Sequence, residues 1–415
     1  MKTIYKYKSY AHFDSKKSSI PWESYIEDPS NIIKHGFYPF VHFVLKSWKY
    51  DNEAGDTKTK PRDINYSSHI DRYIYEYYNS KLNEKYNQYA KCHGINKCSV
   101  AYRNNLHQNN ITIAKEIFSH ISQNGDAFII VSDFSKYFDK IDHAYLKTQL
   151  QTVLCAERLS DDWFKVFKSI SRYSYIDLEK IAEQQNLSLS ELRRKQQLCN
   201  KEEFKEIKKH IKTNIDGYGI PQGSSISATL ANINLIHYDE DINNYVTARN
   251  GIYRRYCDDV IVVLPIRYRA DFLQFYNEEN KTIPGLLVNQ DKIKNYNYIS
   301  SIIRAMDGKP SWLRYLGFEF SGREIRIREG TVTSFYLKGY RSIKKIRQLS
   351  KKYGRNAYRA KFYRTFTHLG KRKSKICQGN FLSYVDRCAH IMNEPRIKKQ
   401  ARNHWRNFHK KLNAP

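Results

Sequence analysis

The pattern of apolar and polar positions predicts several short strands in the first three quarters of the chain. Residues 127–132 (Ala-Phe-Ile-Ile-Val-Ser) form an apolar run rich in β-branched residues, which predicts a buried strand. Residues 252–256 and 260–264 are two further apolar runs on either side of an acidic pair, the pattern of a β-hairpin. An apolar stretch at 38–45 is followed by a polar break at 51–59, which predicts a loop.

Helical patterns dominate the remainder of the chain. Residues 67–120 are predicted to be largely helical. Residues 161–213 are polar, charged and rich in helix formers, which indicates a helical insertion. From Thr333 onward the periodicity predicts three or four amphipathic helices, with breaks at Gly354 and near Gly379.

Composition identifies a globular protein. The chain has 415 residues, of which 40% are apolar and 14% aromatic, too many for a disordered polymer and enough for two to four folding units. No apolar run reaches the ~18 residues of a membrane span, and the first residues lack the apolar core of a signal peptide. Seven scattered cysteines without a C-x-x-C pair argue against disulfides and structural zinc. A cytoplasmic location is expected, with no membrane partner.

The charge is concentrated at the C-terminal end. The whole chain carries a formal charge of +29, and residues 321–415 contain 26 Lys and Arg against 4 Asp and Glu. AT-rich codon bias explains part of the lysine content but not the local scarcity of acids, so the tail is predicted to bind nucleic acid. Lys344, Lys345 and Lys352 recur at helical spacing and predict a phosphate-contacting face, with a solvated helix face as the alternative.

Two acidic sites lie at predicted strand ends. Asp133 directly follows the strand at 127–132, and Asp258-Asp259 lie inside the predicted hairpin. Charges beside buried strands are costly unless they are paired or bind a cation, and oxygen ligands suit Mg²⁺, with Mn²⁺ as an alternative. Two such ions can activate a hydroxyl and stabilise a leaving pyrophosphate. The plainer alternatives are an ordinary hairpin turn for the pair and a helix N-cap for Asp133.

A third segment, residues 219–235, supplies context. It begins as the Pro/Gly turn Gly-Ile-Pro-Gln-Gly and continues with apolar residues at helical spacing. A glycine turn that leads into a helix lets backbone N–H groups approach a phosphate or base closely. Without further context, a simple loop before a helix explains it equally well.

Taken in order, these segments resemble the polymerase core of reverse transcriptases, particularly the bacterial enzymes of retrons, group II introns and phage defence. The similarity covers about residues 55–320. Asp133 with Phe138-Asp139 resembles the first catalytic segment, residues 219–235 the template- and nucleotide-contacting segment, and Tyr256–Asp259 the Y-x-D-D hairpin. Weaker matches are Lys60-Pro-Arg62, Ala101-Tyr-Arg103, residues 287–292 and Tyr315-Leu-Gly-Phe318.

The resemblance implies a role for each matched residue. Asp133 and Asp258 would bind both metal ions, and Asp259 would complete the acidic cluster. Phe138 would exclude a ribose 2′-hydroxyl, so deoxynucleoside triphosphates are the expected substrate. The other implied roles are contacts with the nascent base pair by Gln222, with the primer by Tyr256 and Gly317, with the triphosphate by Arg103 and Arg62, and protonation of pyrophosphate by Lys292.

The implied fold is an α+β right hand with an antiparallel palm. The expected parts are fingers (1–120), palm (121–160 and 214–320), a helical insertion (161–213) and a basic helical thumb with the C-terminal tail (321–415). One departure is Ser227-Ala228, where the family has Ser-Pro.

The implied function is RNA-directed DNA synthesis. Its expected partners are a template RNA, supplied by a companion non-coding RNA, and the DNA product. Without an evident second enzyme domain, the chain is most similar to the defence-associated "unknown group" of bacterial reverse transcriptases, of class two as a first choice. Two alternatives remain at this point, an RNA-dependent RNA polymerase and an inactive palm that acts as a nucleic-acid-binding scaffold.

Overall fold

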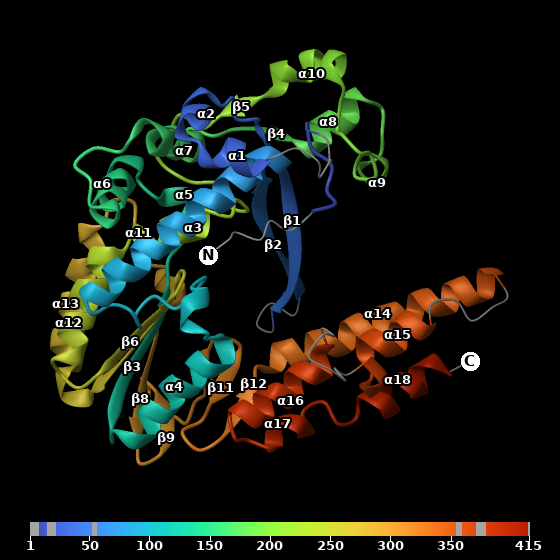
Figure 1. Ribbon diagram of the computed structural model, residues 1–415. Coiled ribbons are helices and arrows are strands. Elements are labelled where there is room, and N and C mark those ends of the chain that lie inside the picture. The colour runs from blue at the N-terminus through green and yellow to red at the C-terminus, as the bar shows by residue number, and fades with distance from the viewer. Residues whose placement is uncertain (1–7, 15–21, 52–55, 354–358, 371–378, 414–415) are drawn as a thin grey trace.

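A five-stranded antiparallel sheet lies at the lower left of the molecule as Figure 1 shows it. The computed structural model describes residues 8–14, 22–51, 56–353, 359–370 and 379–413. The strand order is β6-β7-β3-β8-β9. The strands are β3 (Ala127–Asp133), β6 (Ile252–Tyr256), β7 (Asp259–Pro265), β8 (Lys294–Ile299) and β9 (Ile302–Ala305). The predicted strand at 127–132 and the predicted hairpin are therefore confirmed, as is the α+β class.

Side chains alternate between two cores on the two faces of this sheet, as the period of a strand requires. Phe128 and Ile130 of β3 lie in one core with helices α3, α11, α12 and α13, whereas Ile129 lies in the other with helix α4. The bounds of these helices are α3 (His69–Cys92), α4 (Asn110–Gln123), α11 (Ser227–Ile233), α12 (Ile236–Thr247) and α13 (Arg269–Thr282). Helices thus cover both faces of this five-stranded sheet, which is called the palm sheet below. Polar groups can therefore lie at its strand ends.

A second sheet, of order β2-β1-β4-β5, lies in the N-terminal lobe. Its strands are β1 (Phe40–Asp51), β2 (Asp56–Tyr66), β4 (Ser174–Asp177) and β5 (Lys212–Thr213). The predicted loop at 51–59 is corrected, because a strand begins at Asp56 and pairs with β1 along its whole length. Figure 1 shows these two long strands as a hairpin that extends from the upper lobe toward the C-terminal helices.

The sequence predicted a helical insertion at 161–213. The structure corrects this prediction, because the segment also contains the strands β4 and β5. Its strand β4 pairs in parallel with β1 and so belongs to this second sheet. A small separate core forms around it from residues of helices α8 and α10 and of the N-terminal segment 8–14. The remaining helices of the first half are α1 (Trp22–Glu27), α2 (Pro29–Lys34), α5 (Tyr137–Lys140), α6 (His143–Leu154), α7 (Asp161–Ser171), α8 (Leu178–Gln184), α9 (Leu189–Leu192) and α10 (Lys201–Ile207).

A three-stranded sheet connects the palm to the C-terminal helices. It is formed by β10 (Leu313–Tyr315), β11 (Phe318–Phe320) and β12 (Ile325–Ile327). The helices that follow are α14 (Glu329–Tyr353), α15 (Arg359–Phe366), α16 (Phe381–Ile391), α17 (Arg396–Lys399) and α18 (His404–Leu412). They agree with the predicted helical tail; the predicted break at Gly354 lies outside the described residues.

Close packing fixes the long helix α14 against α18. A Cβ atom on Gly339 would lie 2.4 Å from the Phe408 ring, so only glycine allows this approach. Among the described residues, no helix is both long and apolar enough to cross a bilayer.

Candidate active site

The three predicted acidic residues lie at one end of the palm sheet, although among the residues that the structure describes no group of three or more His, Cys, Asp or Glu side chains is placed to hold a metal ion. Asp133, the last residue of β3, lies directly opposite Asp259, the first residue of β7. Opposite residues of antiparallel strands project to the same face, with Cβ atoms about 4.5–5.5 Å apart. The backbone N–H of Phe134 donates to the Asp258 carbonyl at 3.2 Å, which ties the end of β3 to the adjoining turn. The fold therefore gathers acids that lie more than a hundred residues apart in the sequence.

The turn that carries Asp258 is tight. Tyr256 pairs with Asp259, so Cys257 and Asp258 alone connect β6 to β7. Cys257 adopts a left-handed φ of 61° and is buried, an unusual combination for a residue with a Cβ atom. Such a conformation persists only where the surroundings enforce it.

A buried ion pair supplies that enforcement. Arg255 and Asp239 are both 0% exposed, and the guanidinium meets the two carboxylate oxygens at 2.6 and 2.8 Å. Another N–H of Arg255 donates to the Cys257 carbonyl at 3.0 Å. Although burial opposes the charged form, the Asp239 carboxylate holds the pKa of Arg255 well above its ordinary value. Arg255 therefore stays charged, and its bond to the Cys257 carbonyl anchors the turn.

Lys292 lies beside Asp133. Its ammonium forms an ion pair with the Asp133 carboxylate, and the Asn289 backbone N–H donates to the Asp133 carbonyl at 2.9 Å. The other carboxylate oxygen, Oδ1, is buried and accepts no hydrogen bond from any described residue. A buried carboxylate oxygen without a donor is costly, and its electron pairs suit a cation.

The predicted segment at 219–235 lies against the residues that follow Asp133. The Ile220 N–H donates to the Phe138 carbonyl at 2.9 Å, and Gln222 Nε2 donates to Asp139 Oδ1 at 3.3 Å. Burial raises the pKa of Asp139, and the bond from Gln222 opposes that shift. Phe138 is partly buried against the main core. Gln222 thus contacts Asp139, the residue that follows Phe138.

Gly223 joins this segment to the fingers. It has a φ of 123°, and a Cβ there would lie 2.6 Å from the Asn65 carbonyl oxygen. The Asn65 N–H in turn donates to the Gln222 carbonyl at 2.7 Å. At the departure from the family pattern, the Ser227 hydroxyl donates to the Pro221 carbonyl at 2.7 Å and closes the turn without a second proline.

The expectation for Arg103 is not supported and is corrected. Its side chain is only 4% exposed, and its guanidinium donates to Asn87, to the Ser99 carbonyl, and to both the side chain and the carbonyl of Asn96. A guanidinium with its donors used in this way stabilises its own segment and does not face a triphosphate. Arg62, by contrast, is exposed on β2.

Tyr256 and the turn that contains Gly317 are the predicted primer contacts. Burial, with the charge of Asp259, raises the pKa of Tyr256. Gly317 has a φ of 89° in the two-residue turn between β10 and β11, where a side chain would be strained. Burial and then the Asp259 charge raise the pKa of the adjoining Tyr315, so this turn lies within electrostatic reach of the acids.

The predicted basic face forms on α14. Lys344, Lys345 and Lys352 are exposed, whereas Ile343 and Ile346 are buried in the second core. The lysines therefore lie on the side of the helix away from its packing. Lys371, Arg372, Lys373 and Lys375 lie outside the described residues.

Sequence reasoning missed the Arg255–Asp239 pair. A signal existed, because two arginines interrupt the apolar run 252–256, and a charge inside a buried strand needs a partner. The partner lies on α12, and only the folded chain identifies it.

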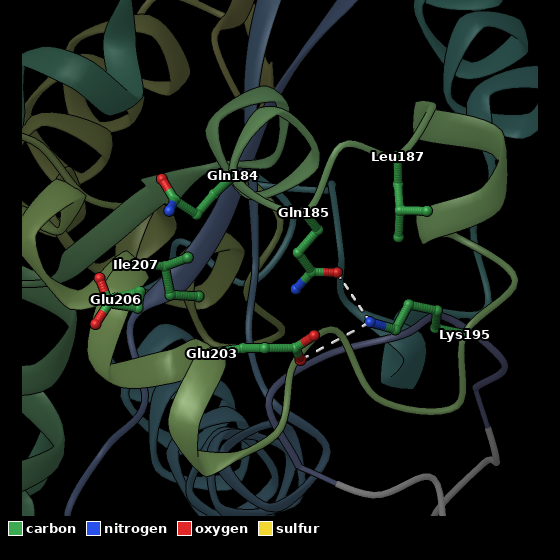
Figure 2. A pocket seen from close by; sticks show the side chains of 7 residues that line it. All are labelled: Gln184, Gln185, Leu187, Lys195, Glu203, Glu206 and Ile207. Atoms are coloured by element: carbon green, nitrogen blue, oxygen red, sulfur yellow. Dashed lines mark hydrogen bonds and ion pairs between the residues drawn. The ribbon is translucent and has the colours of Figure 1, made fainter.

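A surface pocket of about 200 Å³ lies away from these residues. It is formed by α8, α10 and the intervening loop, and Figure 2 shows Lys195 between Gln185 and Glu203 at its edge. None of the predicted site residues lines it.

Comparisons with known proteins give likeness at the level of structure alone. No family model and no curated protein matches the sequence. A telomerase from Candida tropicalis, truncated from its C-terminal domain, aligns with a TM-score of 0.46 and 12% identity over 73% of this chain and 58% of that one. A telomerase from Candida albicans with a fragment of telomeric RNA aligns at 0.42 and 11% identity, over 91% and 64%. The chain thus spans less than two thirds of either telomerase.

Proposed function

We propose that this chain is an RNA-directed DNA polymerase, which adds deoxynucleotides to a 3′-hydroxyl. The observation that carries the proposal is the pairing of Asp133 with Asp259 across β3 and β7, with Asp258 in the adjoining turn. Three carboxylates at one sheet end suit chemistry on a triphosphate, because its charge must be neutralised by cations.

The proposed reaction requires two Mg²⁺ ions, or Mn²⁺ in their place, although the described side chains do not form a ready site of three or more ligands. Asp133 and Asp258 would hold them, and the unpartnered Oδ1 of Asp133 is an available ligand. When bound, the ions would lower the pKa of the attacking hydroxyl and stabilise the leaving pyrophosphate. Lys292, already beside Asp133, has an ammonium proton that it can give to the pyrophosphate.

The neighbouring side chains would select and hold the substrates. Phe138 would exclude a 2′-hydroxyl, and Gln222, hydrogen-bonded to Asp139, would contact the nascent base pair. Tyr256 and Gly317 would support the primer end, and Arg62 would contact the triphosphate.

The basic face of α14 would hold the template–product duplex, since its lysines are exposed and face away from the core. A companion non-coding RNA as template, and a role in anti-phage defence in the bacterial cytoplasm, rest on the sequence resemblance alone.

The test is incorporation of labelled deoxynucleotides on a primed RNA template by the full chain. Asp258→Ala with Asp259→Ala is expected to abolish Mg²⁺-dependent incorporation and to leave the melting temperature nearly unchanged. Asp307→Ala removes an exposed carboxylate that pairs with Lys309 and serves as the matched control. Full incorporation by the double variant would refute the proposal. Equal incorporation of ribonucleotides would favour an RNA polymerase.

A further inference from the structure

The segment 98–103 runs beside the strand that leads into the turn bearing Asp258. The Arg255 N–H donates to the Cys98 carbonyl at 2.7 Å, and the Val100 N–H donates to the Arg255 carbonyl at 3.0 Å. Ser99 and Arg255 form a parallel bridge. Tyr102 lies three residues beyond this bridge on one segment, and Asp258 lies three residues beyond it on the other.

Both neighbours of Tyr102 are anchored. The Ala101 carbonyl accepts a hydrogen bond from Asn232 Nδ2 at 3.0 Å, and Arg103 is held by its buried guanidinium. Between them Tyr102 has a φ of 61° and a side chain that is 55% exposed. A left-handed backbone is unfavourable for a residue with a Cβ atom, and an exposed ring recovers little of that cost by packing. The fold thus keeps a bulky side chain where glycine or asparagine would be more stable.

The Tyr102 hydroxyl interacts electrostatically with Asp258 and with Arg62 of β2. Its partial burial, followed by the charges of Cys257, Tyr256 and Asp258, raises the pKa of Tyr102 to about 12, while Arg62 of β2 opposes the shift. The hydroxyl is therefore a neutral hydrogen-bond donor near pH 7, within electrostatic reach of both Asp258 and Arg62.

We infer that Tyr102 contacts the incoming nucleoside triphosphate and takes the position that the sequence resemblance gives to Arg103. The ring packs against the sugar, and the hydroxyl donates to a phosphate oxygen on the side of Arg62. The buried Arg103 acts as the anchor that forces Tyr102 outward. This inference rests on the proposed function, since it requires a nucleotide at the acidic cluster.

The experiment measures deoxynucleotide binding by the full chain on an RNA template whose primer ends in a dideoxynucleotide, so that no incorporation occurs. Tyr102→Ala is expected to weaken binding by about tenfold or more, and Tyr102→Phe, which removes the hydroxyl alone, by a smaller factor.

Tyr102→Gly separates a substrate contact from a structural role. Glycine relieves the backbone strain, so the melting temperature is expected to hold or rise while binding weakens as in Tyr102→Ala. Ser300→Gly is the matched control. Ser300 has a φ of 51° and is exposed in the turn between β8 and β9, beyond the far end of β3 from Asp133. It should gain the same relief without any change in binding.

Nucleotide binding within twofold of wild type in both Tyr102→Ala and Tyr102→Gly would overturn the inference. If the wild-type chain binds nucleotide, the Tyr102 variants bind it more weakly, and the wild-type chain does not extend an unblocked primer, the contact is supported and the polymerase proposal is refuted. A wild-type chain that binds no nucleotide would refute both.

Discussion

The buried pair of Arg255 and Asp239 should be the most sensitive point of the palm. Asp239→Ala leaves the Arg255 guanidinium charged, fully buried and without its carboxylate. It also removes the acceptor of the buried Tyr253 hydroxyl, now at 2.6 Å. Breaking one side of a buried ion pair costs about 3–5 kcal/mol. At about 2–4 °C per kcal/mol for units of 150–250 residues, the melting temperature should fall by roughly 6–20 °C.

The double variant Asp239→Leu with Arg255→Met distinguishes charge from packing. It removes both charges together, so it is expected to be more stable than Asp239→Ala, because replacing a whole buried pair is often nearly neutral. Incorporation should nevertheless drop, since the Cys257 carbonyl loses the donor that fixes the turn. Urea and thermal unfolding give the stabilities. Glu183→Ala, which breaks the exposed pair with Lys180, is the control and should leave the stability nearly unchanged. Additive losses in the double variant would refute the reasoning.

Three further outcomes are expected. Phe138→Ala should raise ribonucleotide incorporation relative to deoxynucleotides in a competition assay, and an unchanged ratio with activity preserved would assign sugar selection elsewhere. Neutralising Lys344, Lys345 and Lys352 together should make the slope of log affinity for a nucleic-acid duplex against log salt shallower by about 2–3. An unchanged slope would show that this helix face does not bind the duplex. Burial lowers the pKa of His12 to about 3, so the folded state excludes a proton that the unfolded chain binds below about 6.5. The contribution of neutral His12 to the free energy of unfolding is complete above that pH and is lost as the pH falls, by roughly 1.4 kcal/mol at pH 5.5. His12→Gln should therefore flatten the pH dependence of the free energy of unfolding.

The sequence predicted best those elements whose residues interact with near neighbours. The hairpin of β6 and β7 was visible because two apolar runs flank a two-residue turn, and β3 because an uninterrupted run of β-branched residues ends in an acid. Strand β2 was missed because it is polar and pairs only with β1, so no burial pattern marks it. The short β4 and β5 have only four and two residues, and their pairing depends on the distant β1.

The candidate site was predicted by residue type more than by orientation. A motif match places an arginine at position 103, but it does not say which way the side chain points. The direction is set by Asn87 and Asn96, which accept hydrogen bonds from the guanidinium and draw it inward. No role was predicted for Tyr102, since its sequence neighbours do not reveal a left-handed backbone. Tertiary contacts bury Arg103 and leave the adjacent Tyr102 exposed.

These observations connect the stability of the palm to its chemistry. The acids lie at the end of a sheet that is covered on both faces, so strands such as β3 can be largely apolar and still end in a charge. The turn with Asp258 has a strained residue at Cys257, and the segment with Tyr102 has another. Arg255 contacts both, through its backbone to Cys98 and Val100 and through its side chain to the Cys257 carbonyl. One buried arginine therefore sets the position of an acidic turn and of the segment beside it. A change at Arg255 should shift both together, even though its side chain reaches no solvent.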